Sequence, residues 1–441
     1  MAYVRSSSLT STINLAALEL ATLTAVSRRL IPFLFVLYVV SYLDRVNVAF
    51  AALEMNRDLA LSPAVYGFGA SIFFIGYSLF EVPSNLILAR IGARRWIARI
   101  LITWGIVAAA MMFVRGPLSF YVLRFLLGIA EAGFFPGIVF YLTEWFPAEA
   151  RARAIARFMT AIPLAGVIGG PISGALLGLN GALGLRGWQW LFLLEGLPAI
   201  VLGLLVLRYL PDRPENVAWL TPEQRGWLTE RLAVERQRCL ERHSFSVIRA
   251  LSSGVVWQLG LLVFLSVSFG VYALGLWLPQ IVKGFSTLSD LQVGFVSAIP
   301  SLVAAVVMVI VAKHSDRTGE RCLHIAASSA AATLGFLGCA LVQSPSLAIM
   351  FLSIAMAGLL SAHGPFWPLP SRFLTGAAAA GGIALINSLA NLSGFAGPYV
   401  LGLLSANGDF HTGLFVLAFV PFAGMALALR LRHASLLGEA T

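Results

Sequence analysis

Long apolar segments alternate with short polar ones along almost the whole chain. Each apolar segment holds roughly twenty residues, and a helix of that length crosses a hydrocarbon core about 30 Å thick at about 1.5 Å per residue. We expect transmembrane helices at 30–52, 66–88, 97–114, 119–142, 154–178, 189–210, 256–282, 292–313, 323–342, 346–369, 379–404 and 411–430. The pattern therefore predicts an all-α membrane protein with twelve transmembrane helices.

One long hydrophilic stretch interrupts this pattern near the middle of the chain. It runs from Pro211 to Val255 and contains the segment TPEQRGWLTERLAVERQR, which is expected to include helical pieces. Six apolar segments precede it and six follow it. We therefore expect a six-helix half at 1–210, a cytoplasmic linker at 211–255 and a second six-helix half at 256–441.

Composition narrows the class of protein. Of the 441 residues, 59% are hydrophobic and only 11% are charged, whereas soluble domains are close to half apolar and a quarter charged. So few charges cannot cover the surface of a soluble chain of this length. The sequence thus excludes a soluble enzyme, a disordered chain and a fibrous repeat. The remaining class is a membrane protein with several spans, because a lipid bilayer tolerates so much apolar surface.

The basic residues set the expected orientation. The formal net charge is +10, and 24 of the 30 basic residues lie in segments on the same side as the N-terminus. The loops on the other side hold Arg57, Arg115, Arg186 and Lys283. Because an excess of Lys and Arg marks cytoplasmic loops, both termini are expected in the cytoplasm. This placement in short loops also argues against nucleic acid as a partner.

Two landmarks repeat along the chain at one spacing. The loop ARIGARR ends at Arg95, the loop DRTGERC ends at Cys322, and their glycines, Gly92 and Gly319, are 227 residues apart. The pairs Gly170-Pro171 and Gly397-Pro398 are separated by the same 227 residues. A common offset indicates duplicated halves, which is the architecture of many secondary transporters.

These repeated loops resemble the signature of the major facilitator superfamily, G-x-x-x-D-R-x-G-x-R-R. The second copy keeps Asp316, Arg317, Gly319 and Arg321. The first copy has Asn85 in place of the first glycine and Ala89 in place of the acid. The resemblance implies the major facilitator fold. In that family the acid of this loop holds the loop to a neighbouring helix, and Ala89 has no carboxylate with which to make this contact.

Further segments are similar to the anion:cation symporter branch of that superfamily. They are SYLDRVNVAFA, FEVPSNLILARIGARRW, RFLLGIAEAGFFPGIVFYLTEWFP, GPFWPLPSRFL and INSLANLSGFAGPY. The likeness covers the chain from the first span to the last and is nearest to transporters of the tartrate type. It implies proton-coupled import of a small organic anion across a bacterial inner membrane. Tartrate, sugar acids and aromatic carboxylates are the substrates that the branch suggests.

Charged residues inside the spans are concentrated in the first half. A charge at the bilayer centre costs about 2.5–3.5 kcal/mol on insertion scales, so such residues need a partner or a task. The first half contains Asp44, Arg45, Glu81, Arg124, Glu131 and Glu195, whereas His363 is the clear ionisable residue at depth in the second half. This asymmetry favours proton chemistry in the first half and neutral hydrogen-bonding recognition in the second.

Four of these residues form the main candidate site. Arg124 and Glu131 are two helical turns apart and share a helix face. Asp44 can pair with Arg124, or Arg45 with Glu131; a purely structural ion-pair network is the alternative interpretation. The family resemblance implies that Asp44 and Glu131 are the protonation sites and that Arg45 and Arg124 contact the substrate anion.

Such an arrangement couples two ligands by electrostatics. If a substrate carboxylate takes an arginine, the protein carboxylate loses its counter-ion and binds a proton more readily. Entry of a monoanion into a negative interior is opposed by about 2.3 kcal/mol per 100 mV. One proton makes the cycle electroneutral and a second makes it voltage-driven. Protons are thus the expected coupling ion, and no cofactor or metal is expected.

Neutral residues supply further candidates for substrate binding. Asn387 and Asn391 share one face of the eleventh span, although asparagine also holds membrane helices together. His363 and Trp367 lie where several prolines break the tenth span, and broken helices are tolerated where backbone lines a cavity. Tyr42, two residues before Asp44, is a third kind of candidate; Tyr272 and Gln280 of the seventh span are possible cavity residues.

Other in-span features are interpreted as structural. Glu81 and Glu195 are expected to serve packing or pairing more than transport. Glycines recur every fourth residue from Gly166 to Gly178, which is typical of close helix packing.

Three other functions remain as alternatives: an exporter, a membrane-embedded enzyme and a non-transporting sensor, for which the linker of about 45 residues is too short to hold an obvious signalling domain. A proton-driven exporter of metabolites or drugs is the main one, although arginines within the spans disfavour lipophilic cations as substrates. A membrane-embedded enzyme is not supported, because no HExxH, GxSxG or CxxC pattern occurs. We expect a monomer that binds a small organic anion and protons within the lipid bilayer.

Overall fold

The computed structural model describes residues 2–241, 253–370, 376–405 and 409–437, and these residues form helices and connecting turns without a β-strand. The first part of the chain forms α1 (Ala2–Asp58), α2 (Pro63–Ile91), α3 (Ala93–Ala110), η1 (Met111–Phe113), α4 (Pro117–Glu131), α5 (Phe134–Thr143), α6 (Ala148–Met159), α7 (Ala161–Leu177), η2 (Ala182–Gly184) and α8 (Gly187–Tyr209). The next segment forms η3 (Pro214–Asn216) and α9 (Pro222–Glu241). The last part forms α11 (Gly254–Val263), η4 (Phe264–Ser268), α12 (Phe269–Gly284), α13 (Asp290–Thr318), α14 (Cys322–Leu341), α15 (Pro345–Ser361), α16 (His363–Phe366), α18 (Gly376–Leu404) and α19 (His411–Leu437).

The helices confirm the all-α membrane fold. By length and composition, 11 helical segments of the described chain can cross a membrane. The remaining predicted span, 379–404, lies within α18, whose 29 residues extend about 43 Å at about 1.5 Å per residue. The expected helix in the hydrophilic stretch is α9.

Several predicted spans consist of consecutive helical pieces. The fourth span is divided between α4 and α5 at Gly133, whose φ of 84° is left-handed and suits a residue without a Cβ. This break follows directly after Glu131, the last residue of α4. The seventh span contains one turn of π-helix, η4, which the hydrophobic pattern did not indicate. Such turns often occur at functional sites.

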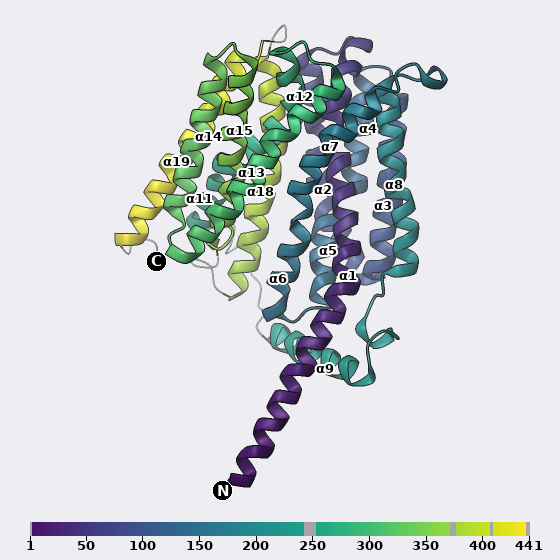
Figure 1. Cartoon of the computed structure of the whole chain (residues 1–441), viewed down its shortest axis with the longest axis vertical. Helices are drawn as coiled ribbons and strands as arrows, with labels where there is room; N and C mark the ends of the chain where they lie inside the picture. The colour runs from purple at the N-terminus through teal and green to yellow at the C-terminus, as the bar shows by residue number, and fades with distance from the viewer. Residues whose placement is uncertain (1, 242–252, 371–375, 406–408, 438–441) are drawn as a thin grey trace.

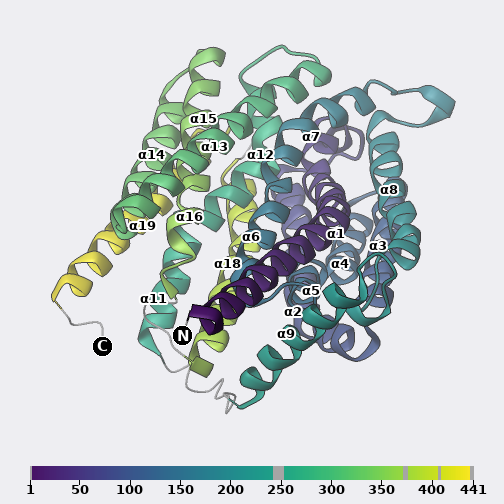
Figure 2. The same ribbon diagram turned by 60° about the horizontal axis from the view of Figure 1, so that its bottom comes forward.

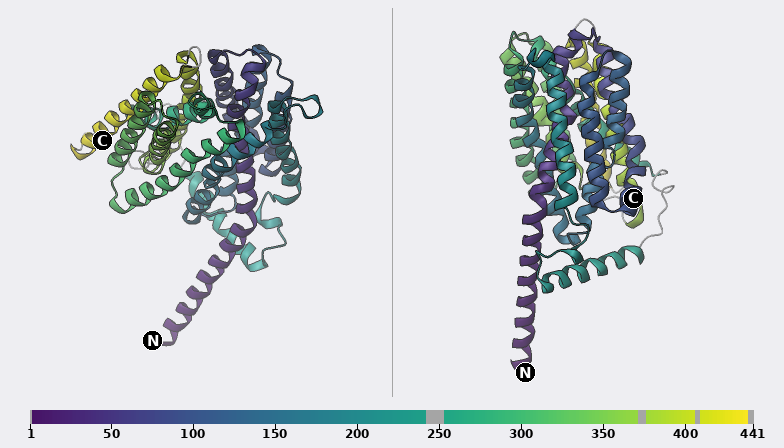
Figure 3. Two further views of the ribbon diagram at one scale, coloured as in Figure 1. Left: turned by 45° about the horizontal axis from the view of Figure 1, so that its top comes forward. Right: turned by 90° about the vertical axis from the view of Figure 1, so that its right-hand side faces the viewer.

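Figure 1 shows the helices in two groups, with α1–α8 on one side and α11–α19 on the other. The helix α9 lies across the lower end, as the right-hand view of Figure 3 also shows. In Figure 1 the N-terminal part of α1 extends beyond the helical bundle past α9, and in Figure 2 the same part of α1 comes forward in front of the other helices. Ion pairs tie α9 to the start of α6, because Glu235 accepts from Arg151 at 2.6 Å and Glu149 accepts from Arg231 at 2.8 Å.

The two groups of helices meet at the end away from α9. The Tyr66 hydroxyl on α2 donates to the Leu276 carbonyl on α12 at 2.7 Å, and the Asn56 amide donates to Gln280 at 3.1 Å. On α7 and α13, the backbone approaches so closely that a Cβ on Gly170 would overlap the carbonyl of Gly294. These contacts close the upper end of the molecule between the two groups.

Each repeated loop contacts the chain at the end of the last spanning helix of its own group, α8 in the first group and α19 in the second. In the first loop, where Ala89 replaces the acid, Asp212 supplies the carboxylate: it accepts from the Arg94 backbone N–H at 3.0 Å. In the second loop, Asp316 pairs with Arg321 at 2.7 Å, and Glu320 accepts from Arg432 of α19 at 3.1 Å. The missing acid of the first copy is therefore replaced by one from beyond α8.

Candidate functional site

An ion pair between Arg45 and Glu131 forms the centre of the candidate site. Arg45 on α1 donates to the Glu131 carboxylate at the end of α4, and the Ser41 hydroxyl donates to the same oxygen at 3.3 Å. Glu131 is 1% exposed, and 17% of the Arg45 side chain is exposed. Both residues lie about 20 Å along their helices from the upper ends, since each is 13 or 14 residues from the helix end at about 1.5 Å per residue. The pair is thus at mid-depth.

Aromatic rings join this pair to the second arginine. The Arg45 guanidinium lies 5.6 Å from the centre of the Phe73 ring and 5.4 Å from that of Tyr77. The Arg124 guanidinium lies 4.9 Å from the same Phe73 ring. Stacking on aromatic faces stabilises a cation without neutralising it, so the rings leave Arg45 charged for Glu131 and Arg124 charged for another anion.

Arg124 is buried and makes hydrogen bonds only to backbone within the described residues. It donates to the carbonyls of Gly69 at 3.4 Å and Ala70 at 2.9 Å, and its Nη1 has no hydrogen-bond partner. Of the two pairings that the sequence allowed, the structure contains Arg45 with Glu131 and not Asp44 with Arg124. An arginine that is 1% exposed and has no carboxylate is a suitable site for an anion.

Asp44 points away from the arginine pair. It is 2% exposed, and its Oδ1 accepts from the Asn47 amide at 3.2 Å. Glu195 on α8 is also buried and accepts from the Ser173 hydroxyl at 2.8 Å. Of these three buried carboxylates, Glu131 is paired with an arginine, whereas Asp44 and Glu195 contact neutral groups.

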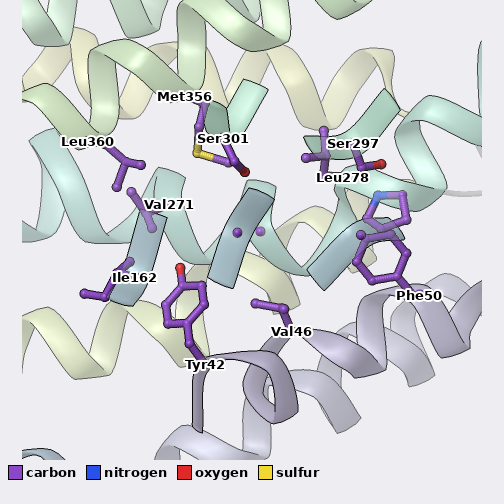
Figure 4. Close-up of a pocket in the computed structure, with 14 residues that line it drawn as sticks. Tyr42, Val46, Phe50, Ile162, Val271, Leu278, Ser297, Ser301, Met356 and Leu360 are labelled. Carbon is purple, nitrogen blue, oxygen red and sulfur yellow. The ribbon is translucent and has the colours of Figure 1, made fainter. Parts of the chain in front are cut away.

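Tyr42 lines a pocket between the two groups of helices. Figure 4 shows its hydroxyl directed into the pocket, where Ser297 and Ser301 of α13 supply further hydroxyls. The rest of the lining is mostly apolar and includes Phe50, Val271 and aliphatic side chains of α7, α12 and α15. Arg45, Arg124 and Glu131 are not among the lining residues, so the pocket adjoins the charged site without containing it.

Asn391 contacts the first group of helices directly. Its amide donates to the Glu81 carboxylate of α2 at 3.3 Å. Tyr272 of α12 packs against Phe74 of α2, with ring centres 4.6 Å apart. The second group thus places the Asn391 amide and the Tyr272 phenol against α2, near the depth of the Arg45–Glu131 pair. Glu81, which the sequence interpretation treated as structural, contacts a residue predicted to bind substrate.

The remaining predicted residues of the second group make no polar contact with the arginines within the described part of the chain. The Nδ1 of His363 is buried without a hydrogen-bond partner, and Trp367 is 37% exposed. Asn387 is half-buried on α18. Among the described residues, no hydrogen bond or ion pair links these three to Arg45, Arg124 or Glu131. Their role in binding stays a prediction.

Sequence reasoning missed several polar and aromatic neighbours of the site. Asn47 on α1 is 2% exposed and donates to Asp44. Asn47 could have been found from its position one helical turn after Asp44, which places both on one face. Phe73 and Tyr77 carry no polar signal that separates them from other aromatic residues of the core.

The chain matches known transporters along most of its length. Residues 34–398 match the family model of the Major Facilitator Superfamily. A protein of Agrobacterium vitis described as "Putative tartrate transporter" is 49% identical over 95% of this chain and 93% of its own length. A "Quinolone resistance transporter" of Acinetobacter baumannii is 43% identical over 93% of this chain and 94% of its own length.

Solved structures share the fold at low sequence identity. A bacterial homologue of the human lysosomal transporter Spinster, inward-facing and occupied, has a TM-score of 0.76 at 16% identity and covers 91% of this chain and 96% of its own. The xylose transporter XylE of E. coli has a TM-score of 0.72 at 15% identity, covering 93% and 98%. The chain is a membrane transporter and not an enzyme, and it belongs to the major facilitator superfamily.

Proposed function

We propose that this protein imports a small organic anion together with protons, by alternating access around the Arg45–Glu131 pair. The observation that carries the proposal is the arrangement of two guanidinium groups about one ring, Phe73, with a single carboxylate, Glu131, paired to them. The site thus holds more positive charge than its own acid neutralises. A hydroxy-dicarboxylate such as tartrate, a sugar acid or an aromatic carboxylate fits that excess.

The coupling follows from the shared use of Arg45. A substrate carboxylate that pairs with Arg45 displaces Glu131, which then has only the Ser41 hydroxyl as a partner. A buried carboxylate without its cation favours the protonated form. Proton binding at Glu131 likewise releases Arg45 for the substrate, because the two ligands act on one pair reciprocally. Asp44 is the second proposed protonation site.

The two groups of helices supply the two sides of the proposed cavity. Arg45, Arg124 and Tyr42 contribute from the first group, and Asn387, Asn391, His363 and Trp367 from the second. The contacts of Gly170 with Gly294 and of Tyr66 with Leu276 close the end away from α9. With residues 211–255 as a cytoplasmic linker and both termini inside, this closed end faces the outside of a bacterial inner membrane.

Uptake by purified protein in liposomes tests the proposal. Labelled tartrate, a sugar acid and an aromatic acid are offered with an inward proton gradient, and a protonophore is expected to abolish accumulation. The Glu131→Gln variant is expected to lose proton-driven accumulation while it still exchanges labelled for unlabelled substrate. Proton-driven accumulation by this variant at the wild-type level would contradict the assignment of Glu131.

Export is a second candidate function, and the resemblance to the quinolone resistance transporter favours it. Transport direction separates the two candidates. An exporter would take up quinolones into inverted vesicles in exchange for protons and would show no protonophore-sensitive uptake of organic acids. The importer is expected to show the opposite pattern.

A further inference from the structure

Two buried carboxylates lie on either side of one amide, outside the Arg45–Glu131 pair. Asn47 on α1 donates to Asp44 Oδ1 at 3.2 Å and also faces Glu195 on α8. Glu195 Oε1 accepts from the Ser173 hydroxyl of α7 at 2.8 Å. The chain Asp44–Asn47–Glu195–Ser173 therefore connects three helices through polar groups inside the first group of helices.

This chain is shielded from water. Asp44, Asn47, Glu195 and Ser173 are 2%, 2%, 6% and 1% exposed. The helices around it pack closely, since α1 contacts both α7 and α8, and α3 covers α8. A charge at this position is solvated only by the groups that the protein provides.

The described part of the chain pairs neither acid with a cation. Among the described residues, no Lys, Arg or His forms an ion pair with Asp44 or Glu195. The groups that face Asp44 are Glu195, the more distant Glu131, and the Trp104 indole of α3. The neighbouring Arg45 is already bound to Glu131. Two ionised carboxylates would thus repel each other in a medium of low dielectric constant.

Each carboxylate also has one oxygen that lacks a partner. Asp44 Oδ2 and Glu195 Oε2 are both buried without a hydrogen bond. A buried acceptor without a donor is unfavourable, and more so when it is charged. A proton on either acid removes one of the two charges and converts one orphan oxygen into a hydroxyl donor. Neighbouring carboxylates that interact this strongly titrate as a pair.

We infer that Asp44 and Glu195 form a single protonation site joined by Asn47, with Glu195 sharing the proton that the proposed function assigns to Asp44. In the proton-loaded state, one O–H bond exists in the pair and the other acid is a carboxylate held by the Asn47 amide. Release breaks that O–H bond, and the proton passes to a water molecule that reaches the pair when the first group of helices opens during the transport cycle. Glu195 is thereby a positioning residue for coupling and not a substrate ligand; this role rests on the proposed function.

Infrared difference spectroscopy of the purified protein tests the shared site without requiring transport. The carbonyl band of protonated carboxyl groups is followed during a pH titration of wild type, Asp44→Asn and Glu195→Gln. Removing the second acid relieves the repulsion, so Glu195→Gln is expected to shift the disappearance of the Asp44 band to lower pH. The shift should correspond to at least about a tenfold change in proton affinity, the scale of a coupled pair.

Matched variants separate this effect from general disturbance. Glu54→Gln removes another buried carboxylate of α1 and is expected to leave the titration of the Asp44 band unchanged. Glu195→Asp keeps a carboxyl group and is expected to restore a titration close to the wild-type one, and it also serves if Glu195→Gln does not fold. An unchanged Asp44 titration in Glu195→Gln, or a shift in Glu195→Asp as large as that expected of Glu195→Gln, would overturn the inference.

Transport measurements then distinguish the inference from the proposed function. In liposomes, Glu195→Gln is expected to shift the pH profile of proton-driven organic anion uptake to lower pH. If wild type moves no protons with any organic anion, the proposed function fails, whereas the infrared titration still decides whether the two acids share a site. If transport is proton-coupled and the pH profile of Glu195→Gln matches wild type, the inference alone fails.

Discussion

Glu81 and Asn391 are 310 positions apart in sequence, and their side chains form a hydrogen bond of 3.3 Å between α2 and α18. This bond links the two groups of helices at a point where Arg45 also acts electrostatically on Glu81. The Glu81 carboxylate therefore contacts one predicted substrate ligand and lies in the field of another. A substrate carboxylate would need the same two interactions, a hydrogen bond from Asn391 and attraction to Arg45.

We therefore expect Glu81 to compete with the substrate. In Glu81→Gln the side chain can still accept from Asn391, but the negative charge is gone. Loss of about 1 kcal/mol of competing charge-assisted interaction corresponds to roughly fivefold tighter binding of the organic anion. Binding to the purified variant at fixed pH, with Glu223→Gln on exposed α9 as the control, measures the change. Weaker binding in Glu81→Gln would show that Glu81 supports the substrate.

Arg124 is expected to tolerate no replacement by lysine. Its guanidinium stacks on Phe73 while it donates to the Gly69 and Ala70 carbonyls, and a lysine ammonium cannot keep both kinds of contact. Loss of one hydrogen bond to a charged group costs about 1.5–3 kcal/mol, or roughly 10- to 100-fold in substrate affinity. Equilibrium binding of labelled organic anion to Arg124→Lys tests this. Affinity within twofold of wild type would remove Arg124 from the site.

Gly170 is expected to control which side of the transporter is closed. A leucine at this position would collide with the Gly294 backbone and separate α7 from α13 at the end away from α9. The Gly170→Leu variant should thus favour a conformation open at that end. Double electron–electron resonance spectroscopy should report a longer distance between spin labels at positions 183 and 287 in the variant. Gly116→Leu, at a glycine with nothing near its Cβ position, is the control, and an unchanged distance in Gly170→Leu would contradict the expectation.

Glu235 is expected to hold α9 against α6. It pairs with Arg151 at 2.6 Å and accepts from the Ala148 backbone N–H at 3.0 Å, at the first residue of α6. Because Glu235 and Arg151 are both about a quarter exposed, the ion pair contributes at most about 1 kcal/mol. Limited trypsin digestion of Glu235→Gln should cleave α9 up to about fivefold faster, with Glu230→Gln as the exposed control. Equal cleavage rates would show that other contacts hold α9.

The sequence by itself was enough to predict the lipid environment, the spanning helices and the family. Runs of about twenty apolar residues have few alternatives to a spanning helix, because backbone polar groups in lipid must bond within the segment. The same reasoning made the in-span charges stand out, since each is costly to bury. Asp44, Arg45, Arg124 and Glu131 were therefore identifiable from the order of residues alone.

Only the tertiary structure decided how these charges are paired. Sequence spacing constrains residues on one helix, whereas the rotation of α1 against α4 and α8 depends on the packing of all the helices. That rotation directs Arg45 to Glu131 and turns Asp44 toward Glu195. It likewise brings Glu81 to Asn391 across the two groups of helices. Side chains on separate helices meet through packing, and no local pattern in the chain records which of them will do so.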